Sequence, residues 1–248
     1  MGRVPGGRTR GGRDPRPGGP PPAAAPTVSH PVFATLYDCC TGSAEHLLGP
    51  RRRALLAGCH GEVLDLGAGT GANFPFFCSL IEGGISVRLH AVEPDPHMER
   101  RARRRAQALG LPVDLRSAPA EQLPFEDGSF DYIISTLVLC TVADPRRAVS
   151  EAYRVLRPEG ELRFLEHVRT TGAAGHWQDR LRPLWALLAG GCQLNRPTGE
   201  TLRAAPFRHL EWEETWLPFP LCRLLTGRAR KGMSPPAAMA SEVPPAGG

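Results

Sequence analysis

The residues best suited to bind a ligand form one short stretch, Asp65-Leu66-Gly67-Ala68-Gly69-Thr70-Gly71. An apolar run from Val63 comes before the first glycine and predicts a buried strand, and an apolar segment from Asn73 to Leu80 predicts a short helix after the last one. Glycines at every second position let the chain turn tightly and let a ligand approach the backbone without meeting a Cβ atom. A strand, a glycine turn and a helix together predict a nucleotide-binding site.

The charge of Asp65 indicates which kind of nucleotide this turn would accept. A carboxylate at the carboxyl end of the strand, two residues before Gly67, favours a positively charged ligand. The same turn also satisfies the dinucleotide pattern G-x-G-x-x-G/A, with Ala72 at its last position and Glu93 near the distance expected of a ribose-binding acid. Because pyrophosphate is anionic and Asp65 would repel it, the sequence favours a cationic ligand over NAD.

Further segments follow this turn in the order and spacing of a known class of proteins. The stretch from Asp65 to Gly71 resembles the first motif of the class I S-adenosylmethionine (SAM)-dependent methyltransferases, of the methyltransferase type 11 or ubiquinone- and menaquinone-methyltransferase kind. The later motifs of these methyltransferases are matched by four segments of this chain, Val92 to Asp95, Ala120 to Phe125, Asp127 to Asp131 and Leu156 to Leu162. The resemblance extends from about His30 to Lys231. Because this family uses SAM, the resemblance implies SAM as the cofactor.

The resemblance also implies which residues contact SAM. They are Tyr37, Asp65, Gly67, Ala68, Gly69, Gly71, Glu93, Pro94, Ala120, Glu121 and Thr136. Asp65 would lie under the cationic ligand, and Glu93 would accept hydrogen bonds from both ribose hydroxyls. Tyr37 belongs to a Phe-x-x-x-Tyr-Asp pattern that lies over the cofactor in the quinone-type relatives. Many relatives carry an aspartate where this chain has Ala118-Pro119, which leaves backbone contacts for the adenine.

The fold class implied by the resemblance is α/β. It is a single Rossmann-like domain with a seven-stranded, mostly parallel sheet, an antiparallel last strand and helices on both faces. The expected strands cover 63–66, 87–92, 113–116, 130–135, 161–168, 207–215 and 221–230, and the expected helices cover 73–80, 96–109, 146–156, 175–188 and 198–205. Asp95-Pro96 and Asp144-Pro145 predict two helix N-termini, Gly110 predicts a helix end, and Arg157 to Gly160 predicts a turn.

Composition divides the chain into a domain and two tails. Residues 1–29 are rich in glycine, proline and arginine and residues 232–248 in proline and alanine, so both are expected to be disordered, with the methyltransferase-like domain over 30–231. The first tail holds five arginines and one aspartate, and therefore four of the five net positive charges of the chain. No nucleic-acid partner is expected, and Arg51, Arg52 and Arg53 are interpreted as a solvated face.

The cysteines bear on metal binding and compartment. There are seven of them, an odd number, and none forms a C-x-x-C pair. This argues against a disulfide framework and against a zinc site, so no metal is expected, and it favours a reducing compartment. No run reaches the ~18 apolar residues of a membrane span, and the N-terminus lacks the apolar core of a signal peptide. The expected location is cytoplasmic, with peripheral membrane attachment as the alternative.

Three parts of the chain are candidates for contact with the methyl acceptor. Thr136 to Val142 follows the fourth strand, where the acceptor and the sulfonium should meet, and it is apolar and uncharged. His167, after Glu166 at the end of the fifth strand, is the candidate catalytic base because imidazole titrates near neutral pH, and a packed histidine is the alternative. The amphipathic segment Gly175 to Leu188 is a candidate substrate lid, membrane-surface contact or packed helix.

Three short segments resemble a narrower group, the methyltransferase-like thiol S-methyltransferases of animals and similar bacterial proteins. They are Gly69 to Phe74, Thr136 to Cys140 and Glu166 to Val168. The animal members begin with an apolar membrane anchor, whereas this sequence begins with the Gly/Pro/Arg-rich tail. The expected function is methyl transfer to a small molecule, with a thiol as candidate. The alternatives are a lipid or quinone methyltransferase at a membrane surface and a non-catalytic SAM-binding partner subunit.

Overall fold

The computed structural model describes residues 46–188, 191–217 and 223–233. Tyr37 lies outside these ranges, so its predicted contact with SAM stays a prediction. The same holds for the predicted tail over 1–29 and for most of the tail over 232–248. No helix within the described ranges has the length and apolar character needed to cross a membrane.

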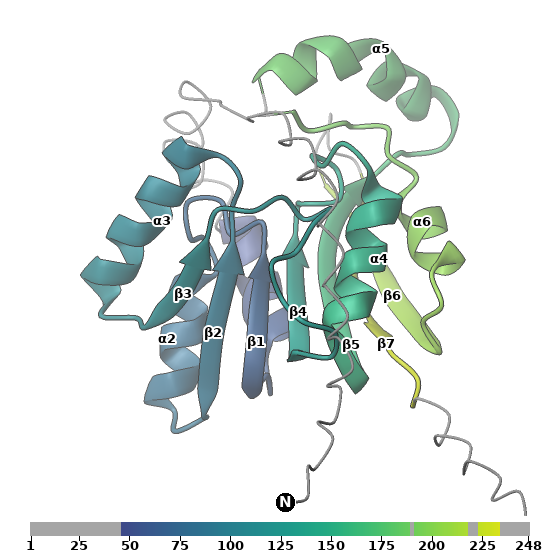
Figure 1. The fold of residues 1–248 in the computed structure, drawn as a ribbon. Coiled ribbons are helices and arrows are strands. Elements are labelled where there is room, and N and C mark those ends of the chain that lie inside the picture. The colour runs from purple at the N-terminus through teal and green to yellow at the C-terminus, as the bar shows by residue number, and fades with distance from the viewer. Residues whose placement is uncertain (1–45, 189–190, 218–222, 234–248) are drawn as a thin grey trace, which may run out of the picture.

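One seven-stranded sheet forms the centre of the molecule, in the order β3-β2-β1-β4-β5-β7-β6 (Figure 1). Its strands are β1 (Gly61–Leu66), β2 (Val87–Val92), β3 (Val113–Arg116), β4 (Phe130–Thr136), β5 (Leu156–Val168), β6 (His209–Trp216) and β7 (Arg223–Arg230). Strand β7 runs antiparallel to both of its neighbours, β5 and β6, and the pairs from β3 to β5 are parallel. The predicted α/β fold, with an antiparallel last strand, is confirmed.

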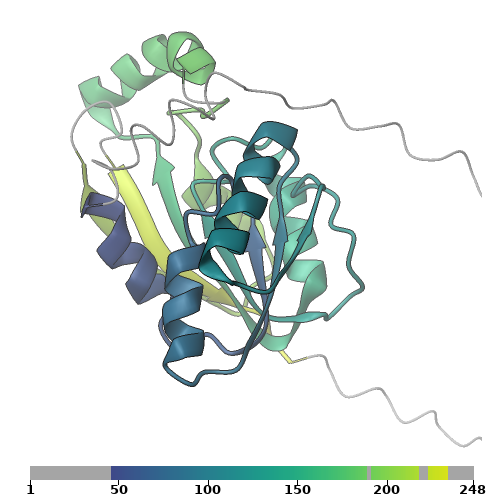
Figure 2. The same ribbon diagram turned by 90° about the vertical axis from the view of Figure 1, so that its left-hand side faces the viewer.

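Helices cover both faces of this sheet (Figures 1 and 2). They comprise a helix over 46–56, α2 (Phe74–Glu82), α3 (Pro96–Leu109), α4 (Pro145–Val155), α5 (Gly172–Leu188) and α6 (Thr198–Ala204). Helices α4 and α6 contact each other on one side of the sheet, and α2 and α3 contact each other on the opposite side. Helix α5 lies beyond the carboxyl ends of the parallel strands, where the predicted acceptor segment begins (Figure 1).

Short-range signals explain why the predicted helix boundaries agree with the structure. The Asp95 carboxylate accepts hydrogen bonds from the amides of His97 and Met98 at the start of α3, and Gly110 ends that helix in the left-handed conformation. The Asp144 carboxylate caps α4 in the same way. The aspartate caps satisfy amides that have no partner inside the helix, and the Gly110 cap satisfies carbonyls at the end of α3. These local signals mark where both helices begin and where α3 ends.

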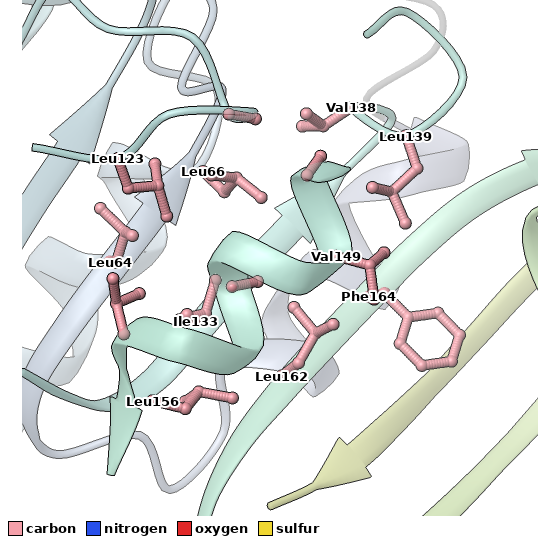
Figure 3. Packing of buried hydrophobic residues seen from close by; sticks show 14 of the residues in the cluster. Leu64, Leu66, Leu123, Ile133, Val138, Leu139, Val149, Leu156, Leu162 and Phe164 are labelled. Carbon is pink, nitrogen blue, oxygen red and sulfur yellow. The ribbon is translucent and has the colours of Figure 1, made fainter. Parts of the chain in front are cut away.

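The core consists of two apolar layers, one on each face of the sheet. Alternate residues of β1 point to opposite layers, with Leu64 and Leu66 in one and Val63 in the other. In the first layer these leucines lie with Val149 of α4 and Phe164 of β5 (Figure 3). A central strand buried on both faces must be apolar at nearly every position, which makes the buried acid Asp65 in the same strand an exception that requires a function.

One predicted turn is wrong. Arg157 to Gly160 was expected to separate α4 from the fifth strand, but β5 already begins at Leu156. Phe130 pairs with Leu156 and Tyr132 with Glu161, so the four turn residues form an irregularity inside the strand. Backbone hydrogen bonds to Lys231 hold Glu159 and Gly160 in place, and this long-range contact cannot be inferred from the local proline and glycine.

The glycine turn after β1 has the backbone conformation that its sequence predicts. Gly67, Gly69 and Gly71 all have positive φ angles. A Cβ atom on Gly67 would lie 2.8 Å from a methyl group of Val138, whereas a Cβ atom on Gly69 would meet nothing within 4 Å. Gly67 therefore permits close packing, and Gly69 leaves open space above the turn.

Replacing Gly67 with alanine tests the close packing of this turn. Gly110 has the same φ of 60°, but a Cβ atom there meets nothing within 4 Å, so Gly110→Ala is the matched control. Both variants place an L-residue in the left-handed region, which costs about 1–2 kcal/mol. Gly67→Ala should lower the free energy of unfolding in urea by roughly 1–3 kcal/mol more, because it also overpacks against Val138. Equal losses would contradict the packing role.

Candidate active site

Asp65 is the centre of the candidate site. Its side chain is fully buried at the carboxyl end of β1, and its Oδ1 accepts a hydrogen bond of 2.7 Å from Nδ2 of Asn73. Its second oxygen, Oδ2, has no hydrogen-bond partner among the residues that the structure describes. Burial raises the pKa of Asp65 to about 7, while the Asn73 hydrogen bond and the charge of Arg52 act in the opposite direction. A buried carboxylate whose Oδ2 has no partner is a favourable contact for a cationic ligand.

Arg52 provides the positive charge nearest to this acid, contrary to the prediction that Arg51 to Arg53 form a solvated face. Its side chain is 2% exposed, and Nη1 donates to Oδ1 of Asn73 at 2.7 Å and to Oγ1 of Thr136 at 2.9 Å. Nδ2 of Asn73 also lies 3.1 Å from Oγ1 of Thr136. The helix over 46–56, the glycine turn and the end of β4 are therefore joined by one buried polar cluster, Arg52-Asn73-Asp65-Thr136.

Glu93 lies beside the glycine turn, as predicted. Its Oε2 accepts from the amide of Gly69 at 2.8 Å, and its Oε1 accepts from the amide of Asp95 at 2.9 Å. The amide of Ala68 donates to the carbonyl of Val92, which ties the turn to the end of β2. Burial raises the pKa of Glu93 to about 7. Each carboxylate oxygen keeps a second lone pair, so two hydroxyl groups can still be bound.

Other predicted cofactor residues have different surroundings. Pro94 lies half-buried between Glu93 and the helix cap, and Ala120 is buried in the core layer with α4. The Glu121 carboxylate accepts from the amides of Ala143 and Asp144, so it orders the segment that leads into α4. The backbone carbonyl of Glu121 accepts from Nε of Arg147 at 2.9 Å, and its predicted contact with SAM stays a prediction.

Glu166, whose structural role the sequence analysis missed, shapes the segment after β4. Leu137 has a φ of 60°, which is unusual for a residue with a side chain. Glu166 is fully buried, and its Oε1 accepts from the hydroxyl of Ser135 at 2.8 Å and the amide of Val138 at 3.0 Å. Thr136 and the run from Val138 to Cys140 are buried, so Leu137, Thr141 and Val142 are the more exposed side chains of this segment.

His167 lies at the end of β5 and is 1% exposed. Its Nε2 is 3.3 Å from Sγ of Cys192, and its Nδ1 is buried without a hydrogen bond to any described residue. The role of His167 as catalytic base stays a prediction, and the ring nitrogen that has a partner faces a cysteine.

These groups fit SAM on their own chemistry. Oδ2 of Asp65 is a buried acceptor without a partner, Gly69 leaves open space above the turn, and Glu93 can accept two hydroxyl groups. A cation and a ribose are thereby provided for on neighbouring strands of one sheet edge, which is where open α/β sheets bind their ligands.

The fold and this set of side chains define a class I SAM-dependent methyltransferase. Residues 64–164 match a family described as "Methyltransferase domain". Thiol S-methyltransferase TMT1B of Homo sapiens is 37% identical over 175 residues, which are 66% of this chain and 69% of that protein. Thiol S-methyltransferase TMT1A of Homo sapiens is 33% identical over 161 residues, 63% of this chain and 64% of that protein. The chain belongs to the SAM-dependent methyltransferase family of these relatives, and the match spans about two thirds of their length.

A solved structure supports the fold independently. The SAM-dependent methyltransferase from Thermotoga maritima superimposes with a TM-score of 0.54 at 22% identity, over 80% of this chain and 99% of that one. At this identity the likeness concerns the fold alone.

Replacing Arg52 with methionine tests the buried polar cluster. Methionine keeps much of the volume but removes both hydrogen bonds to Asn73 and Thr136, so the free energy of unfolding should fall by about 1.5–3 kcal/mol. Arg53→Met is the matched control, because Arg53 is exposed, and should change it by less than about 0.5 kcal/mol. Equal losses of unfolding free energy in the two variants would contradict the role of Arg52 in the buried polar cluster.

The raised pKa values of Asp65 and Glu93 predict how stability changes with pH. Both acids titrate near pH 7 when folded and about 4 when unfolded, so between these values the native state binds more protons, and stability falls as pH rises. Asp65→Asn should reduce this fall by up to about 4 kcal/mol, measured by denaturation at several pH values without SAM. A cationic ligand favours ionised Asp65, so SAM affinity should rise over the same window. A SAM affinity that falls with pH would contradict this role.

Proposed function

We propose that the protein transfers the methyl group of SAM to the sulfur of a small thiol. The acceptor class is supported by the relatives, which are thiol S-methyltransferases at 33% and 37% identity. Asp65, Gly67, Ala68, Gly69 and Gly71 would hold the sulfonium side of SAM, and Glu93 would bind the ribose. Thr136 would contact the cofactor from the end of β4, where Arg52 fixes its hydroxyl.

The observation that carries the choice of a thiol is the burial of His167, the candidate base, and of its neighbour Glu166. Glu166 already accepts from Ser135 and Val138, and His167 faces Cys192. Both side chains are fully buried, so we do not expect either of them to remove a proton from an acceptor. A neutral alcohol would need such a base, whereas a thiol with a pKa of about 8.5 supplies a few per cent of thiolate at pH 7 by itself.

The protein's part in the reaction would then be positioning. SAM supplies a methyl group on a cationic sulfur, which is transferred in one displacement step. Asp65 would hold that charge in a buried site where electrostatic interactions are strong. Thr136 and Leu137 would place the acceptor in line at roughly 3–3.5 Å. The positive φ of Leu137, maintained by the hydrogen bond from Val138 to Glu166, fixes the direction of this segment.

A second candidate follows from the surface of α5. Trp177, Leu184 and Leu187 are 55%, 58% and 77% exposed on this helix, which lies over the carboxyl edge of the sheet. Exposed apolar side chains of this kind are typical of a helix that contacts a lipid surface or covers a substrate. They favour a lipid or quinone acceptor as the alternative to a soluble thiol.

Turnover with an acceptor panel distinguishes the two candidates. The full chain should methylate small thiols with SAM, and its activity should exceed that with matched phenols, amines and alcohols. Glu93→Ala should weaken SAM binding about ten- to a hundredfold in calorimetry. Glu213→Ala is the control, because Glu213 is exposed on the edge strand β6, and it should bind SAM as tightly as the wild type.

Activity on quinone or phospholipid only, together with sedimentation of the protein with liposomes, would replace the thiol by the second candidate. Methylation of no acceptor in the panel, despite SAM binding, would contradict both.

A further inference from the structure

Three segments far apart in the sequence meet at one buried point near the carboxyl edge of the sheet. Cys140 follows β4, His167 lies at the end of β5, and Cys192 lies between α5 and α6. The two sulfur atoms and a ring nitrogen of His167 all lie within 4.8 Å of one another. Cys140 and His167 are each 1% exposed, and Cys192 is half-buried.

Backbone contacts fix this meeting point independently of the side chains. The amide of Gln193 donates to the carbonyl of Cys140 at 2.8 Å, which places Cys192 beside the β4–α4 connection. The amide of Arg169 donates to the carbonyl of Arg196 at 3.2 Å, which ties the same segment to the end of β5. These main-chain hydrogen bonds therefore fix the backbone around Cys192 between the β4–α4 connection and the end of β5.

Polar contacts join members of the cluster to one another and to neighbouring groups, and the thiol of Cys140 donates to the carbonyl of Leu137 at 3.4 Å. Nε2 of His167 is 3.3 Å from Sγ of Cys192, and the indole Nε1 of Trp185 donates to the same sulfur at 3.4 Å. Cysteine binds metals as the thiolate, so both thiols would lose their protons when a cation binds.

We propose that Cys140, His167 and Cys192 bind a thiophilic divalent cation of the zinc class. Two thiolates and an imidazole are preferred ligands of zinc. Together with a divalent cation they carry no net charge, which lowers the cost of burying the ion. The indole of Trp185 hydrogen-bonds one sulfur from outside, as the groups that orient metal ligands do. Three protein ligands are the number found at zinc sites that keep one position open.

In this site His167 acts as a ligand, so Nε2 is not available as a catalytic base. The proposal does not depend on the acceptor, because metal binding can be measured without methyl transfer. It also differs from the expectation of no metal, which rested on the absence of a C-x-x-C pair. Spacing along the chain cannot detect ligands contributed by one strand and two separate connections.

Metal analysis of the full chain, purified reduced and without chelators, tests the site. The wild type should contain about one zinc ion per chain, and reconstitution with cobalt(II) should give sulfur-to-cobalt charge-transfer absorption. Cys140→Ser and Cys192→Ser should each weaken metal binding at least about tenfold in competition with a chromophoric chelator. Cys78→Ser is the matched control, since Cys78 is a half-buried free cysteine on α2, and should bind as the wild type does.

Unchanged SAM binding by the serine variants would show that they remain folded. Retention of the cobalt–sulfur absorption by the double variant of Cys140 and Cys192 would place the metal elsewhere and overturn the proposal. Absence of both zinc and cobalt–sulfur absorption from the reduced wild type would overturn it as well.

Discussion

A single buried carboxylate imposes the main constraint on this structure. Asp65 lies in the central strand of the sheet, where burial on both faces otherwise requires apolar side chains. The charge can be held there only because Asn73 hydrogen-bonds it and Arg52 lies one hydrogen bond further away. The glycine turn, the start of α2 and the helix over 46–56 must all be placed to provide these partners. The arrangement of the elements around the turn therefore follows from the need to stabilise one buried acid.

Local signals made most of the fold predictable from the sequence. Aspartate–proline caps and a terminal glycine located α3 and α4, because each of these effects acts within one helical turn. Asp65, the glycines and Glu93 were likewise found from adjacent residues. The prediction failed at Arg157 to Gly160, where the turn residues lie inside β5 because Lys231, distant in the chain, bonds their backbone.

The missed features all depend on partners that are remote in sequence. Arg52 and its exposed neighbour Arg53 are the same type of residue, and the partners that bind the Arg52 side chain, Asn73 and Thr136, are distant in the chain. The helical position could have indicated this, because residue 52 lies on the same face as the buried residues Leu55 and Leu56. The cluster of Cys140, His167 and Cys192 had no such signal, since one residue lies in strand β5 and the other two in separate connections.

The hydrogen bonds of Arg52 also couple two parts of the molecule thermodynamically. The helix over 46–56 contributes one member of the cluster, and the glycine turn and β4 contribute the others. A ligand that binds the ionised form of Asp65 gains from the nearby guanidinium's hold on Asn73 and Thr136, and in return it stabilises the docked helix by the same factor. Docking of this helix and binding of a cation at Asp65 are therefore linked equilibria.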